Sequence, residues 1–147
     1  MKPFNWREII EKLQDKGDPQ LLWDYITALR GPDNMNNEGY FLKNIFTLLL
    51  RGEEDGFCGL GIADLEWFLW RYKDEEIMNE IGDIEKLKGF VGHWFNHVRY
   101  ALKSLHELGI IEYELVKIVN DMWLKDWKDG LKELLRYYRK KLFKEEK

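Results

Sequence analysis

The sequence predicts an all-α fold, a compact bundle of about six or seven helices around a central apolar helix. Three observations lead to this prediction. No segment alternates apolar and polar residues in the way that a half-buried strand does. All prolines lie at or before Pro32, so the rest of the chain lacks the strongest helix breaker. Hydrophobic residues make up 45% of the chain, enough for a single domain over residues 1–147 to form a core without disulfide bonds.

The first two helices are indicated by residues that favour helix ends. A first helix is expected over about residues 5–14. Asp18 followed by Pro19 is typical of an N-cap and the first position of a second helix. Gly31 and Pro32 then terminate that second helix.

The third predicted helix, over residues 40–51, is apolar around most of its circumference, which is typical of a buried helix. We therefore expect it to be the central one. Its polar side carries Lys43, Thr47 and Arg51, and buried cations are rare unless they are paired. Two explanations stay open. The cations reach solvent or pair with nearby acids, or they line a cavity for an anion such as a phosphate or a carboxylate.

Two longer helices are expected next. The fourth is expected as one helix from residue 62 or 64 to about residue 81, and the fifth over about residues 83–108. Gly89 and Gly92 lie inside the fifth helix and indicate either a break or close packing there. The rest of the chain should form one or two helices with a bend near residues 126–130.

A pair of histidines is the clearest candidate for chemistry. His93 and His97 lie one helical turn apart, and Tyr100 lies on the same polar edge of the fifth helix. Such a pair can share a divalent metal ion, but zinc takes at least three protein ligands, and no further ligand motif is present. Asp24 or Asp33 could complete the ligand set from another helix. An unmetallated pocket and a purely structural role are the alternatives, and no other cofactor is expected.

Tryptophans also recur at helical spacing. Trp67 and Trp70 share one helix face, and Trp123 and Trp127 share another. Packing into the core explains both pairs, and so does an interface in an oligomer, because aromatic residues concentrate at interface centres.

Three motifs resemble those of a group of small helical phage- and prophage-type proteins whose function is not known. They are ALRGPD at residues 28–33, LKxxFTxxLRG at residues 42–52 and HxxxHV at residues 93–98. The resemblance implies an origin in a virus or mobile element. Because the function of the group is not known, it assigns no catalytic roles to residues of this chain. It also implies that seven polar residues belong together: Arg30, Asp33, Lys43, Thr47, Arg51, His93 and His97.

Composition narrows the class of protein and its setting. The net charge of −4 argues against a general nucleic-acid binder. No apolar segment is long enough to span a bilayer, and no signal peptide is evident, so we expect a cytoplasmic protein, in the host cytoplasm if it is viral. A single cysteine, Cys58, excludes an internal disulfide. The many Lys and Glu residues with few Gln are typical of a thermophile protein.

Two functional hypotheses follow. The leading one is an intracellular accessory protein of viral or mobile-element origin that associates with itself or with a host or viral protein. The alternative is a site that binds or hydrolyses a small molecule or nucleotide phosphate. That site would use Arg30, Lys43 and Arg51 as anion clamps and the two histidines as acid–base or metal groups. Either way, we expect the polar sides of the third and fifth helices to meet each other or an acid such as Asp24.

Overall fold

The computed structural model describes residues 5–31, 46, 49–50, 62–82 and 84–143. These residues form seven α-helices and no strand, which confirms the all-α prediction. The helices are α1 (Trp6–Asp15), α2 (Pro19–Arg30), α4 (Ile62–Arg71), α5 (Asp74–Ile81), α6 (Ile84–Glu107), α7 (Tyr113–Leu124) and α8 (Trp127–Leu142).

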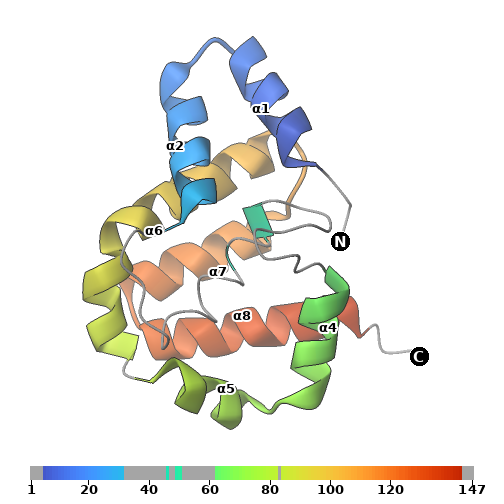
Figure 1. The fold of residues 1–147 in the computed structure, drawn as a ribbon, viewed down its shortest axis with the longest axis vertical. Coiled ribbons are helices and arrows are strands. Elements are labelled where there is room, and N and C mark those ends of the chain that lie inside the picture. Colours follow the sequence, from blue (N-terminus) through green and yellow to red (C-terminus); the bar gives the residue numbers. More distant parts are fainter. Residues whose placement is uncertain (1–4, 32–45, 47–48, 51–61, 83, 144–147) are drawn as a thin grey trace.

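The longest helix, α6, packs against α2, α7 and α8. The α1–α2 hairpin lies at one end of the molecule, α5 lies at the other, and α7 and α8 run side by side between them (Figure 1). Of the predicted central helix, Phe46, Leu49 and Leu50 are buried, and its other residues lie outside the described part of the chain. The Phe46 ring packs edge-on against Phe95 of α6, with the ring centroids 5.1 Å apart.

Local capping sets the ends of the first two helices. Asn5 precedes α1, and its side chain accepts a hydrogen bond from the Arg7 amide at 2.8 Å. Asp18 accepts from the Gln20 amide at 2.9 Å, and α2 begins at the proline that follows it. Gly31 ends α2 with a φ of 84°, a conformation that glycine adopts without a steric penalty. The sequence-based prediction for α2 is therefore confirmed at both ends.

The prediction of one uninterrupted helix over residues 62–81 is wrong, because α4 and α5 are separate helices. Tyr72 and Lys73 lie between them. Arg139 of α8 donates from Nη2 to the Tyr72 carbonyl at 2.8 Å, which satisfies a backbone acceptor that the helix end leaves without an intrahelical partner. The Lys73 amide in turn donates to Glu76 at 3.0 Å and starts α5. The break therefore depends on a residue of α8.

Neither glycine breaks α6, and one of them marks close packing. α6 is continuous through Gly89 and Gly92. A Cβ added at Gly92 would lie 3.1 Å from Cη2 of Trp123 in α7, whereas a Cβ at Gly89 would meet no atom within 4 Å. Only the second of these glycines therefore allows another helix to approach α6.

The bend predicted near residues 126–130 is the boundary between α7 and α8. Asp126 caps α8 by accepting hydrogen bonds from the amides of Lys128 and Asp129. One turn into α8, Gly130 is buried directly against α7. A Cβ added there would lie 2.5 Å from both Cα and Cβ of Met122. The two helices thus approach each other at a point where only glycine fits.

Tyr138 of α8 is fully buried, and its hydroxyl has no hydrogen-bond partner in the described part of the chain. Burial raises the pKa of Tyr138 well above the ordinary tyrosine value, because the ionised phenolate would lose its hydration. The unfolded chain ionises this side chain above about pH 10, while the folded chain keeps it protonated. The stability that this residue contributes is therefore full below about pH 10 and falls as the pH rises further.

Tyr138→Phe should make stability less sensitive to alkaline pH. Between about pH 9.5 and 11.5 the variant should lose less stability than the wild type. At pH 7 its free energy of unfolding should rise by about 1 kcal/mol, since the change removes an unpaired buried hydroxyl. Thermal unfolding followed by circular dichroism over this pH range measures both effects. Tyr113→Phe, at an exposed tyrosine, is the control and should change neither. Identical pH dependence in the two variants would contradict the prediction.

Candidate functional site

A buried aspartate and a histidine meet between α2 and α6. Asp24 of α2 is only 5% exposed. Its Oδ1 lies 2.9 Å from Nδ1 of His97 on α6, and it also accepts a hydrogen bond from Gln20 Nε2 at 3.1 Å. An ionised carboxylate only accepts hydrogen bonds, so the shared proton belongs to Nδ1 of the histidine. The other ring nitrogen, Nε2, is then available as an acceptor or a metal ligand in the neutral imidazole.

The packing of α2 on α6 holds this pair in register. One turn after Asp24 on α2, the carbonyl of Ala28 accepts a hydrogen bond from Nε1 of Trp94 at 2.9 Å. Ala28 is fully buried, and its small side chain lets the two helices approach closely. Trp94 and His97 lie one turn apart on α6, so each bonds to α2 along the same interface. The two hydrogen bonds together fix how far one helix can slide along the other.

His93 extends the site to the surface. It lies one turn before His97 on α6 and is exposed, whereas His97 is mostly buried. The two rings meet edge to face, with centroids 5.1 Å apart and planes at 86°. An imidazole that a buried carboxylate orients can act as a general base or as a metal ligand. Among the described residues, no group of three or more His, Cys, Asp or Glu side chains is placed to hold a metal ion.

The structure brings together three of the residues singled out from the sequence, Asp24, His93 and His97. Arg30 is exposed at the end of α2, and Tyr100 is exposed on α6. The remaining members of the predicted polar cluster lie outside the described residues: Asp33, Lys43, Thr47 and Arg51. The expected contact between the polar sides of the third and fifth helices therefore stays a prediction, as does the phosphate site built on those cations.

Gln20 and Thr27 are the neighbours of the site that sequence reasoning missed. Gln20 lies one turn before Asp24, and that spacing is the only sequence signal for their hydrogen bond. Thr27 follows on α2, and its buried hydroxyl has no partner among the described residues. Nothing in the local sequence distinguishes this threonine from one that faces solvent.

The two tryptophan pairs have different surroundings. Trp127 is fully buried and packs on Phe95, with ring centroids 5.0 Å apart, and Trp123 stacks on the same ring. Trp127 belongs to the core and has no surface left for a partner, and Trp123 is partly buried against the core. Trp67 and Trp70 of α4 are instead 56% and 72% exposed.

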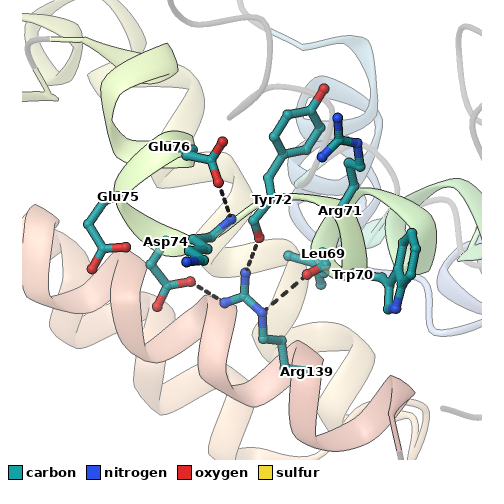
Figure 2. A pocket seen from close by; sticks show the side chains of 9 residues that line it. Leu69, Trp70, Arg71, Tyr72, Asp74, Glu75, Glu76 and Arg139 are labelled. Atoms are coloured by element: carbon teal, nitrogen blue, oxygen red, sulfur yellow. Dashed lines mark hydrogen bonds and ion pairs between the residues drawn. The ribbon is translucent and has the colours of Figure 1, made fainter.

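An open cleft of about 560 Å³ lies where α4, α5 and α8 meet, and Trp70 is one of the residues that line it. Figure 2 shows Arg139 at its centre, paired with Asp74 and bonded to the carbonyls of Leu69 and Tyr72. Trp70 lies on one side of this arginine in the view, and Glu75 lies on the other. The guanidinium therefore joins three helices, and each of its three nitrogens donates to one protein partner.

Comparison with protein-family models, with curated proteins and with solved structures finds no match to this chain. No helix in the described ranges combines the length and the apolar character needed to cross a membrane.

Proposed function

We propose that this protein is an accessory protein that acts by self-association through the exposed face of α4. The observation that carries the proposal is the exposure of Trp67 and Trp70. Single exposed apolar residues are ordinary on protein surfaces. Trp67 and Trp70 lie one turn apart on the same helix. No other two large exposed apolar residues in the described part of the chain are arranged in this way. Tryptophan is among the residues that contribute most to binding when buried at an interface centre.

The charges around the tryptophan pair favour a second copy of this chain as the partner. Arg71 ends α4, Lys73 lies in the α4–α5 junction, and Glu75 and Glu76 follow in the first turn of α5. All four side chains are exposed. A two-fold dimer requires one surface to complement itself. A surface that carries both signs next to an apolar centre satisfies this requirement when two copies meet in opposite directions.

The resemblance to phage-type proteins supports a viral or mobile-element origin and a cytoplasmic setting for this accessory role. The high Lys and Glu content supports a thermophilic host. Neither the proposed origin nor the proposed host depends on the exposed face of α4.

The oligomeric state tests the proposal directly. Sedimentation velocity at about 1–100 μM protein should show a dimer for the wild type. The double variant Trp67→Ser/Trp70→Ser should be monomeric over the same range, because it removes the apolar centre of the interface. Trp23→Ser changes another exposed tryptophan, on α2, and should leave the dimer intact. A monomeric wild-type protein would overturn self-association, and so would equal loss of the dimer in the control.

A further inference from the structure

The spacing of the two histidine rings on α6 matches that of two ligands on one metal ion. With Zn–N bonds of about 2.0–2.1 Å and a near-tetrahedral angle, two imidazole centroids that share one ion lie about 5 Å apart. The rings of His93 and His97 lie 5.1 Å apart. Histidines one turn apart on a helix are also the arrangement that known zinc motifs use for two of their ligands. The rings meet edge to face, so the exposed His93 side chain must turn about its torsions before both histidines can bind one ion.

The hydrogen bond between His97 and Asp24 is a second, independent observation that favours a metal ligand at His97. Metal-binding histidines generally donate their other ring N–H to a carboxylate or carbonyl, which fixes the ring and makes the ligating nitrogen more basic. His97 bonds to Asp24 through Nδ1 in this way, at 2.9 Å. The aspartate is more than nine-tenths buried and is itself held by Gln20. A surface ion pair would need neither this burial nor a second hydrogen bond to the same oxygen.

We propose that His93 and His97 form a chelating site for a divalent transition metal ion, with Asp24 as the positioning residue behind His97. Imidazole ligands select zinc, nickel or copper over magnesium and calcium, which prefer oxygen. His97 binds through Nε2, since its Nδ1 is bonded to Asp24. The described residues supply two protein ligands, so the other coordination positions hold water or a group from outside.

Titration of the full-length, metal-free protein with Zn²⁺ in a calorimeter tests this site. We expect saturable binding of one ion per chain. His93→Ala, at an exposed position, should abolish that binding without affecting the fold. Asp24→Asn should weaken it by about 10- to 100-fold, as expected for a group behind a metal ligand. Mg²⁺ should not compete.

His106→Ala is the matched control. His106 also lies on α6, but its Nδ1 is 3.0 Å from the carbonyl of Ile111, away from the histidine pair. This variant should bind Zn²⁺ as the wild type does. Absence of saturable binding in the wild type, or wild-type affinity in His93→Ala, would overturn the metal site. The metal site is independent of self-association through α4, so the Trp67→Ser/Trp70→Ser variant should still bind the ion.

Discussion

Gly130→Ala should destabilise the protein by about 3 kcal/mol or more. The added Cβ would lie 2.5 Å from backbone and side-chain atoms of Met122, so α8 must move away from α7. The intrinsic helix preference of alanine over glycine favours the variant by about 1 kcal/mol. The steric conflict exceeds this gain, because the nearest atoms include the Met122 Cα, which cannot rotate away.

Gly89→Ala is the control for this substitution. It also places alanine within a helix, but the added Cβ meets no atom within 4 Å. It should therefore stabilise the protein by about 0.5–1 kcal/mol. Urea unfolding of both variants gives the two free energies. Similar stabilities for the two variants would show that α7 and α8 do not approach as closely as described.

His97→Ala should cost about 1–3 kcal/mol of stability. The change leaves the buried carboxylate of Asp24 with Gln20 as its remaining hydrogen-bond donor among the described residues. Breaking a buried pair costs more than the pair itself contributes, because one charge stays buried without compensation. The double variant Asp24→Asn/His97→Ala should recover part of the loss, since its amide carries no charge.

Two exposed positions serve as controls for His97→Ala. His93→Ala and Lys140→Ala should each change the free energy of unfolding by less than about 0.5 kcal/mol, because both side chains face solvent. Chemical denaturation of the single and double variants gives the coupling energy between Asp24 and His97. A coupling energy near zero would contradict the role assigned to the pair.

The elements that the sequence predicts best are those whose ends are set locally. Asp18 and Pro19 start α2, and Gly31 ends it, through interactions within a few residues along the chain. The break between α4 and α5 is set locally only at the start of α5, where the Lys73 amide donates to Glu76. Its carbonyl at Tyr72 is bonded by Arg139, which lies 67 residues further along the chain. Periodicity records which residues share a helix face and carries no information about distant hydrogen bonds.

In the candidate site, too, some features follow from the local sequence and others depend on contacts between distant residues. The spacing of His93 and His97 predicts that they share a face, and the structure agrees. Asp24 could be named only as one of two possible acids, because its contact depends on how α2 is placed along α6. The tryptophan pairs also look alike in sequence, yet Trp127 is buried and Trp70 is exposed. Which face of a helix turns inward is decided by its neighbours, and here Phe95 provides the neighbour for Trp127.

The hydrogen bond between Trp94 and the Ala28 carbonyl has a consequence during synthesis of the chain. It joins residues 66 positions apart, so α2 leaves the ribosome well before its partner on α6 exists. At about 5–20 residues per second, the ribosome needs roughly 3–13 s to add the intervening chain. For that interval the face of α2 that later meets α6 is not covered by α6. A nascent chain stalled between these two helices would therefore expose this face to chaperones or to aggregation.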